Sequence, residues 1–530
     1  MNLHSRRVKG DQRPAPGQVR PDRGHPLAMA VYRSIIGAGP VRGWLGPLLI
    51  TALGGWLRFA HLSTPQAVVF DEIYYAPQAF GILHYGAEHA VSFFGSQSPS
   101  GKATDIFVSG GVFSAHPPFG KVQIALGEWV AGLNPFGWRL AVALAGSASI
   151  LMLARITRRM TGSDLLGCVA GLLLALDGLE LVMSRTAMLD IFVMFWVLAG
   201  FGCLVIDRDQ ARTRLSAQSA GLPPEGAGPR LGVRWWRIAA GCCLGLAAGT
   251  KWNGLYFLVL FAPLCLVWDM TARRGAGFRR YVRGALVTDG AVLLPSLWLT
   301  AAVTYLATWS GWFGSAIGWD RNYAAAHGVR TPVVSALYSL FEYHREMLSY
   351  GTGLNTPSSF ASQPWTWLLL RQPVRFYYAA PRYAESGCTQ AGGCIQNVLA
   401  VGTPAIWWAC LAALPALAAW GLLRRDWRAG AALAGVAAGW LPWFAFPGRT
   451  EYFYYAVAFD PFLCLALTLC IGLIIGPADG SRLRRAGGTA IAAAYLLAVA
   501  VNFAYLYPVL TGTPISDSAW LARMWLSTWI

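Results

Sequence analysis

Long apolar segments separated by shorter polar ones run through most of this chain. Apolar runs of about 20 residues, the length that crosses the hydrocarbon core of a bilayer, recur between Trp44 and Pro508. Within these runs the apolar positions are continuous and do not alternate with polar ones, which argues against the strands of a membrane β-barrel. The pattern therefore predicts an all-α polytopic membrane protein.

The apolar runs predict about eleven transmembrane helices. They are placed at 44–60, 137–154, 164–178, 189–207, 236–250, 252–269, 284–306, 399–423, 429–446, 453–476 and 487–508. One further apolar segment, 120–133, is short and follows His116-Pro117-Pro118. We expect this segment to be a helix that lies at the membrane surface.

The basic residues give the orientation of these spans. With the N-terminus inside, the inner segments hold 28 of the 42 Lys and Arg residues, although the outer loops are longer. This distribution satisfies the positive-inside rule. Counting 120–133 as a span would place Arg155, Arg158 and Arg159 outside and invert every later loop. The formal charge of +17 is therefore assigned to topology, and no nucleic-acid partner is expected.

The orientation also divides the chain into regions. Residues 1–43 are polar and rich in Pro and Arg, which predicts a disordered cytoplasmic tail without a cleavable signal peptide. Residues 44–508 form the predicted transmembrane domain. Its two large extracytoplasmic loops are 61–136 and 307–398. Residues 509–530 are expected to be an extracytoplasmic C-terminal segment.

Two of the ten cysteines differ from the others in their setting. Cys388 and Cys394 flank T-Q-A-G-G in the second outer loop, where an oxidising compartment favours a disulfide. Two thiols without a nearby histidine do not predict a metal site. The remaining cysteines fall in or at spans and are read as packing residues: Cys168, Cys203, Cys242, Cys243, Cys265, Cys410, Cys464 and Cys470.

The residues that can perform chemistry gather on the predicted outer side, beginning with Asp71 and Glu72. Adjacent residues cannot face the same way on a helix, so the two carboxylates are not expected to act as a cooperating pair. A carboxylate near apolar surface has a raised pKa and can accept a proton from a hydroxyl group. We expect Asp71 to be a base and Glu72 to be its structural or binding partner. The alternative is a solvated pair in a loop.

A second group on the outer side is cationic. Cations that converge from separate loops suit a phosphate group. The alternative is contact with lipid headgroups; Arg58, near the outer end of the first span, fits either interpretation. The other members of the group are His116, Lys121, Arg139, Arg185, Lys251 and Arg449.

Two polar residues at the outer ends of spans are further candidates. Asp190 begins a span five residues after Arg185, so it could orient a cation or bind substrate. The alternative is a helix N-terminal acid stabilised by the helix dipole. Asn253 is a candidate to hydrogen-bond a sugar on which Trp252 stacks, although packing is the simpler role for most of the 24 tryptophans.

Five motifs occur in the order and spacing of a known family: F-D-E-I-Y-Y, H-P-P-F-G-K, S-R-T-A-M-L-D, T-K-W-N-G and G-R-T-E-Y-F-Y-Y. Over about residues 44–508 the chain resembles the protein O-mannosyltransferases, and the actinobacterial members most. The resemblance implies a GT-C glycosyltransferase fold with eleven spans. It also implies an inverting transfer of mannose from polyprenyl-phosphate-mannose to Ser or Thr of secreted proteins, outside the bacterial plasma membrane.

The resemblance also implies roles for individual residues. Asp71 matches the family's base, and Glu72 contributes to the active site. Arg58 and Arg139 match arginines that the family needs in its first two spans. The residues expected near the lipid phosphate or the acceptor are His116, Lys121, Arg449 and Tyr452. The chain departs from fungal members at Tyr74, where they have His, and its second outer loop is too short for the MIR domain of eukaryotic members.

Two alternatives from other classes stay open. One is a polyprenyl-phosphate-sugar transferase with another sugar or a lipid acceptor. The other is a lipid-linked sugar transporter; transporters place charged sites near the bilayer midplane, whereas here they lie at one face. No cluster demands a metal, but a divalent cation, Mg or Mn, near Asp71 stays open as a cofactor. Unfolded Ser/Thr-rich acceptors would allow coupling to the protein export machinery.

Overall fold

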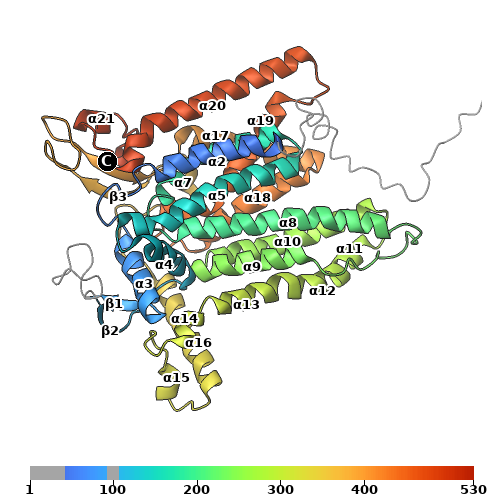
Figure 1. Ribbon diagram of the computed structural model, residues 1–530. Helices are drawn as coiled ribbons and strands as arrows, with labels where there is room; N and C mark the ends of the chain where they lie inside the picture. Colours follow the sequence, from blue (N-terminus) through green and yellow to red (C-terminus); the bar gives the residue numbers. More distant parts are fainter. Residues whose placement is uncertain (1–41, 92–106) are drawn as a thin grey trace, which may run out of the picture.

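The body of the molecule is a bundle of long helices that run in roughly the same direction (Figure 1). The structure, a computed structural model, describes residues 42–91 and 107–530, so the predicted tail 1–43 lies outside the described residues apart from its last two positions. The bundle consists of α2 (Arg42–Phe59), α5 (Pro135–Thr161), α6 (Asp164–Ala175), α8 (Asp190–Gln218), α9 (Trp235–Thr250), α10 (Gly254–Gly275), a composite helix at 281–307, α17 (Pro404–Arg424), α18 (Trp427–Trp440), α19 (Asp460–Ile475) and α20 (Arg482–Thr511). The predicted all-α architecture is confirmed.

The composite helix is assembled from short pieces. α11 (Tyr281–Arg283), α12 (Gly290–Leu293) and α13 (Thr300–Ala307) are joined by π-helical turns at Gly284–Asp289 and Leu294–Leu299. Such turns occur within α-helices as local bulges. The pieces therefore form one apolar helix of 27 residues that is long enough to cross a membrane.

Every predicted span overlaps a helix, but not every helix has the length and hydropathy of a complete span. In the described part of the chain, seven helices do: Pro135–Thr161, Asp190–Gln218, Gly254–Gly275, Tyr281–Ala307, Pro404–Arg424, Phe453–Ile475 and Arg482–Thr511. α6 is apolar but shorter. The chain is thus a multi-pass membrane protein, and the count of eleven spans stays a prediction.

Short elements gather at one end of the bundle, on the left in Figure 1. They come mainly from the two predicted outer loops. They are α3 (Glu72–Tyr85), β1 (His89–Val91), β2 (Phe107–Gly111), α4 (Phe119–Ala131), α7 (Gly178–Met183), α14 (Ser310–Gly314), α15 (Tyr323–Ala326), α16 (Pro332–Gly353), β3 (Val374–Ala379), β4 (Gln396–Ala400) and α21 (Asp517–Leu521), with 3₁₀ turns at Pro364–Leu369, Leu441–Ala445, Phe453–Phe459 and Ser527–Trp529. The segment expected to be a surface helix is α4.

Burial separates the centre of the bundle from its rim. The segment Phe453–Ile475, which contains α19, has 78% of its apolar window buried, because it packs against α6, α17, α18 and α20. A helix that is apolar all round belongs in such a core. α20 has only 22% of its window buried and lies at the edge of the bundle in Figure 1. The apolar residues it exposes face the lipid.

Buried ion pairs tie the helices together toward the end opposite the outer loops. Each pair joins two different segments among α8, the start of α9, the end of α10 and the π-helical turn at Gly284–Asp289. The pairs are Arg234–Asp207 at 2.6 Å, Arg237–Asp269 at 2.8 Å and Arg273–Asp289 at 2.7 Å. Arginines that the sequence assigns to topology therefore also cross-link the helices.

The strands form two small antiparallel hairpins, β1–β2 and β3–β4. The connection between β3 and β4 contains a disulfide between Cys388 and Cys394, whose Cα atoms are 5.7 Å apart. The other eight cysteines are free thiols. The bridge closes the loop that the sequence places in an oxidising compartment.

Candidate active site

Glu72, the first residue of α3, is held by hydrogen bonds from three parts of the chain. Its Oε1 accepts from Arg139 Nε at 2.7 Å and from the backbone N–H of Ala187 at 3.0 Å. Its Oε2 accepts from Arg139 Nη2 at 2.8 Å and from the N–H of Val69 at 2.8 Å. Glu72 and Arg139 are fully buried. This arrangement fixes the start of α3 and therefore the adjacent Asp71.

The Arg139 guanidinium also donates hydrogen bonds to backbone carbonyl groups. It donates to the carbonyl groups of Pro65 at 2.9 Å, Ala67 at 2.8 Å and Leu62 at 3.3 Å. A guanidinium has five N–H groups in a fixed fork, and here they organise the loop before α3. These contacts give Arg139 a positioning role at the start of α3, and its contact with substrate stays a prediction.

Asp71 is the N-cap residue of α3 and lies beside charged and phenolic groups. Burial raises its pKa to about 6; the positive charge of Lys251 opposes this rise, and the negative charge of Asp190 adds to it. The phenol of Tyr75, one helical turn later, interacts with the carboxylate and also opposes the rise in pKa. A carboxylate with a pKa near neutrality is suited to general-base catalysis.

Lys251 connects Asp71 to the other polar groups. Its ammonium donates to both carboxylate oxygens of Asp190, at 2.9 and 3.0 Å, and lies 4.3 Å from the ring centre of Tyr455. Lys251 and Asp190 are both buried. Of the roles predicted for Asp190, this geometry favours the one in which its carboxylate orients a cation, here Lys251. Asp190 is also the first residue of α8.

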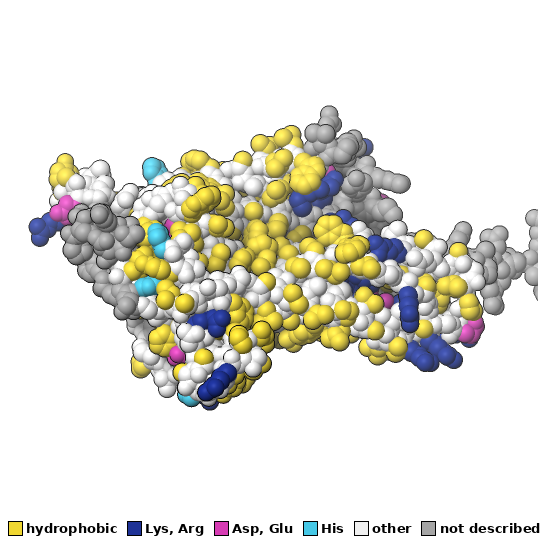
Figure 2. All heavy atoms as spheres, turned by 60° about the horizontal axis from the view of Figure 1, so that its bottom comes forward, with side chains coloured by type: hydrophobic (Ala, Val, Ile, Leu, Met, Phe, Trp, Pro, Cys, Tyr) yellow, Lys and Arg dark blue, Asp and Glu magenta, His cyan; other side chains and the backbone are white. Residues whose placement is uncertain are grey.

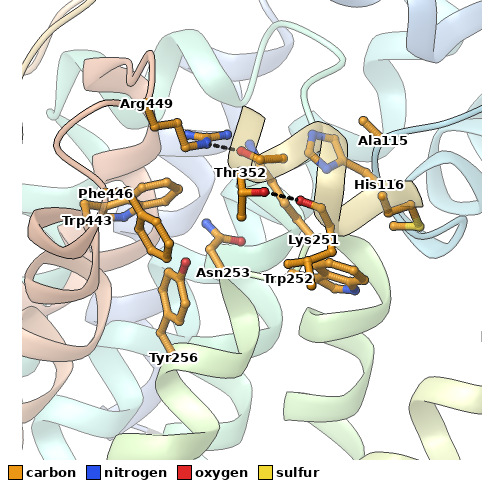
Figure 3. Close-up of a pocket in the computed structure, with 13 residues that line it drawn as sticks. Ala115, His116, Lys251, Trp252, Asn253, Tyr256, Thr352, Trp443, Phe446 and Arg449 are labelled. Carbon is orange, nitrogen blue, oxygen red and sulfur yellow. Dashed lines mark hydrogen bonds between the residues drawn. The ribbon is translucent and has the colours of Figure 1, made fainter. Parts of the chain in front are cut away.

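Lys251 lines an open pocket at the outer-loop end of the bundle, with about 640 Å³ of empty space that includes open solvent. Figure 3 shows Tyr256, Trp443 and Phe446 on one side of it and Trp252 and His116 on the other. The lining residues are Ala115, His116, Lys251, Trp252, Asn253, Tyr256, Met347, Leu348, Gly351, Thr352, Trp443, Phe446 and Arg449. Asp71 is not one of them, but the charge of Lys251, which is one of them, acts on its carboxylate. Aromatic walls beside several cationic or polar groups suit a sugar that carries an anion.

His116 is neutral in this environment. Burial and the positive charges of Lys251, Lys121 and Arg449 hold its pKa well below the usual value. Lys121 lies deeper, where its ammonium donates to the His116 carbonyl at 2.9 Å and to the Ser114 hydroxyl. It also pairs with Glu88 at 2.7 Å. Lys121 therefore positions the His116 loop, whereas His116 itself faces the pocket.

Arg58 and Arg185 are placed at the end of α2, away from the pocket lining. Arg58 is fully buried and pairs with Glu180. Arg185 donates to the carbonyls of Arg58 at 2.8 Å, Ala60 at 2.7 Å and His61 at 2.9 Å. These are among the carbonyl groups that a helix leaves unpaired at its C-terminus. Both arginines thus secure α2.

Arg449 and Asn253 retain polar atoms directed at the pocket. Arg449 donates through Nε to the Gly351 carbonyl at 2.8 Å and through Nη1 to the Thr450 carbonyl at 3.3 Å. The buried Oδ1 of Asn253 has no hydrogen-bond partner among the described residues. Tyr452 stacks on Tyr454, with ring centres 5.7 Å apart, and does not line the pocket.

Several residues of the site were not identified from the sequence. Tyr75 had a usable signal, because it follows Asp71 by four positions and so lies on the same helical face. Tyr455 also had a signal, because it ends the G-R-T-E-Y-F-Y-Y motif. Trp443 and Tyr256 had no signal that separates them from the many packing aromatics. The described residues contain no group of three or more His, Cys, Asp or Glu side chains that could hold a metal ion.

Comparison with known proteins covers nearly the whole chain. Residues 48–310 match the family model of dolichyl-phosphate-mannose-protein mannosyltransferase, and residues 336–529 match that of the C-terminal four TMM region of protein-O-mannosyltransferase. The polyprenol-phosphate-mannose–protein mannosyltransferase of Mycobacterium tuberculosis is 40% identical over 92% of both chains. The protein of that name from Corynebacterium glutamicum is 33% identical over 89% of this chain and 91% of its own length.

A solved structure shares the fold. It is that of the Saccharomyces cerevisiae protein O-mannosyltransferase Pmt1-Pmt2 complex bound to the sugar donor. It superposes with a TM-score of 0.70, at 13% sequence identity, and the match covers 95% of this chain and 94% of the other.

Proposed function

Because the chain belongs to the protein O-mannosyltransferase family, we propose that it transfers mannose from polyprenyl-phosphate-mannose to Ser or Thr hydroxyls of secreted proteins. The membership predicted from the five motifs is confirmed, and with it the GT-C fold and a glycosyltransferase activity. The roles of single residues are our proposal and rest on the pocket's geometry.

In the proposed reaction, Asp71 is the catalytic base. It accepts the proton of the acceptor hydroxyl as the hydroxyl oxygen attacks the anomeric carbon. The bond from that carbon to the phosphate oxygen breaks, and polyprenyl phosphate leaves from the opposite side with the bonding electrons, so the configuration inverts. The observation that carries this proposal is a carboxylate whose pKa is about 6 and on which the charge of Lys251, a residue of the pocket lining, acts.

The leaving group is an anion, and it needs charge stabilisation more than a proton. Preorganised cations provide this at the point where charge develops. Lys251 and Arg449 line the pocket and carry positive charge, and neutral His116 can donate a hydrogen bond there. Asn253 and the aromatic walls are proposed to hold the sugar. Tyr452 is proposed to order the neighbouring tyrosines rather than to touch substrate.

The remaining residues of the predicted site are proposed as positioning residues. Glu72 and Arg139 fix the start of α3, and Lys121 with Glu88 fixes the His116 loop. Arg58 and Arg185 hold α2. This division leaves His116, Lys251 and Arg449 in the pocket lining, with Asp71 outside it as the proposed base.

The orientation and partners follow from the distribution of charge. We propose that the pocket end faces outward from a bacterial plasma membrane, because most basic residues lie toward the other end. The acceptors would then be secreted, Ser/Thr-rich chains, reached before they fold, which allows coupling to the protein export machinery. The tail at 1–43 would be cytoplasmic and the segment at 509–530 outside.

The test is mannose transfer in membranes that contain the protein or its Asp71→Asn variant. Labelled polyprenyl-phosphate-mannose and a Ser/Thr-rich peptide are supplied, and label on the peptide and donor bound to the protein are measured separately. We expect the variant to lose transfer and keep donor binding. Asp517→Asn, at an exposed carboxylate at the same end, is the control. Full transfer by Asp71→Asn would overturn the assignment, and donor binding without transfer by the unaltered protein would favour another acceptor or a transporter.

A further inference from the structure

The helix α16 exposes a row of large apolar side chains. Val333, Val334, Leu337, Phe341 and Leu348 are each more than half exposed. Apart from the adjacent Val333 and Val334, successive members lie three, four or seven residues apart, which places them on one face of the helix. Contiguous exposed apolar surface of this kind marks contact with a partner or a membrane.

Another face of α16 is packed against the protein. Leu340, Tyr343 and Met347 are buried in a cluster with Trp309 and Trp312. The C-terminal part of the helix supplies Met347, Leu348, Gly351 and Thr352 to the pocket lining. α16 is therefore fixed in place, and it contacts the pocket at one end.

The direction of α16 relates its exposed face to the bilayer. In Figure 1 it lies at the outer-loop end of the bundle, runs across the direction of the long helices and extends sideways beyond them. Because the long helices cross the membrane, a helix across them at their outer end lies along the membrane surface. Amphipathic helices in that position bury their apolar face at the boundary between headgroups and acyl chains.

The neighbouring span has a lipid-facing surface of the same kind. The helix at 281–307 leads through α14 and α15 to α16, and it exposes Leu294, Leu299 and Val303 by more than half. Figure 2 brings this side of the molecule forward and shows hydrophobic atoms extending from the bundle onto the lobe at the lower left. The apolar face of α16 thus continues a surface that is already in lipid.

We propose that α16 is an interfacial helix, inserted by its Val333–Phe341 face into the outer leaflet of the membrane, which it joins to one wall of the pocket. This inference rests on the orientation given under the proposed function. The segment 315–353 contains three basic residues (Arg321, Arg330 and Arg345) and three acidic ones (Asp320, Glu342 and Glu346). Insertion is therefore driven by apolar burial and does not depend on anionic lipid.

Photocrosslinking tests the proposal in the full-length protein. Phe341→p-benzoylphenylalanine and, separately, Val334→p-benzoylphenylalanine are placed in phosphatidylcholine nanodiscs, with or without phosphatidylglycerol, and in bacterial membranes. The same substitution at Leu299 is the lipid-exposed control. Tyr383, which is exposed in the connection between β3 and β4 that also contains the disulfide, is the aqueous control. Adducts are identified by mass spectrometry and gel mobility, and mannose transfer is measured in parallel.

Phospholipid adducts at 341 and 334, at a yield within about twofold of Leu299 and independent of phosphatidylglycerol, are expected. Three outcomes would overturn the proposal: crosslinked dimers of the chain, crosslinks to another protein, or no adduct where Leu299 gives one. Each result is read from the crosslink alone, so it stands whether or not the protein transfers mannose. A failure of transfer with lipid adducts intact would count only against the proposed function.

Discussion

The ammonium of Lys251 lies 2.9 Å from the carboxylate of Asp190, although 61 positions separate the two residues. The pair brings together the end of α9 and the start of α8. Its two charges act in opposite directions on the pKa of Asp71. The proposed base is therefore tuned by an ion pair that includes a pocket residue.

Transfer is expected to fall as the pH drops through about 6. The proposed base must be ionised to accept a proton, and burial raises the pKa of Asp71 to about 6. A plot of log(kcat/KM) against pH should therefore have an acid limb near that pH with a slope close to one. A limb near pH 4 would show that this carboxylate is not the titrating base.

Asp71→Asn is expected to make the protein more stable while transfer is lost. Because the folded pKa exceeds the unfolded value, the folded state binds the proton more tightly, so the ionised group opposes folding above about pH 6. A shift of roughly two pKa units corresponds to about 3 kcal/mol, and removing the charge recovers up to that amount. Thermal unfolding at pH 8 checks this, with Asp517→Asn as control. A lower Tm for Asp71→Asn would contradict the burial argument.

Asp190→Asn is expected to move the acid limb to lower pH. The substitution removes a negative charge that raises the pKa of Asp71 and leaves the charge of Lys251 unopposed, so Asp71 ionises more readily. Loss of one partner of a buried pair also costs about 3–5 kcal/mol of stability. The pH profile distinguishes these effects, because destabilisation alone lowers activity at all pH values. An acid limb at unchanged pH would show that the charge of Asp190 does not affect the pKa of Asp71.

Glu72→Gln is expected to act mainly on stability. It removes the charge that compensates the buried Arg139 guanidinium, which costs about 3–5 kcal/mol. The Tm should fall, and transfer by the folded fraction should fall less than in Asp71→Asn. Arg139→Lys, which keeps the charge but loses the bidentate geometry, should have an intermediate Tm. If Glu72→Gln lost transfer at an unchanged Tm, Glu72 would be a catalytic residue instead.

Tyr305→Phe is expected to weaken substrate binding through Trp252. The Tyr305 hydroxyl accepts a hydrogen bond from Trp252 Nε1 at 3.1 Å and contacts His344 Nε2 at 2.5 Å, so it holds a side chain of the pocket wall. Losing the roughly 1 kcal/mol that this hydrogen bond contributes to donor binding would raise the KM for the donor about fivefold and leave kcat nearly unchanged. Tyr338→Phe, on the exposed side of α16, is the matched control. A fall in kcat at constant KM would place Tyr305 in the reaction itself.

The apolar runs were sufficient to place the helices, because a helix in lipid must satisfy its backbone internally and remain apolar over its length. The charge asymmetry was sufficient to put the pocket's polar groups at one end. Neither signal gives a helix's exact ends. α18, for example, ends at Trp440 and continues as a 3₁₀ turn.

The partners of the outer cations could not be obtained from the sequence. Arg58 and Arg449 end or follow apolar segments, Arg139 lies at the start of one, and the sequence does not distinguish their roles. They differ because Glu180 lies 122 positions from Arg58 and Glu72 lies 67 positions from Arg139, and only folding brings these pairs together. Arg449 has no such carboxylate partner among the described residues, and it remains available to the pocket.

The buried ion pairs at the inner end also bear on biogenesis. Arg234–Asp207 closes the α8–α9 helical hairpin and Arg273–Asp289 closes the next one, while Arg237–Asp269 joins the two. In the proposed orientation these arginines lie at the cytoplasmic end, and each pair can form only after both of the segments that it joins have been inserted. The same arginines would thus act first as signals for the orientation of the helices and then as partners in ion pairs. The two hairpins could therefore form and pack together in the order of their synthesis.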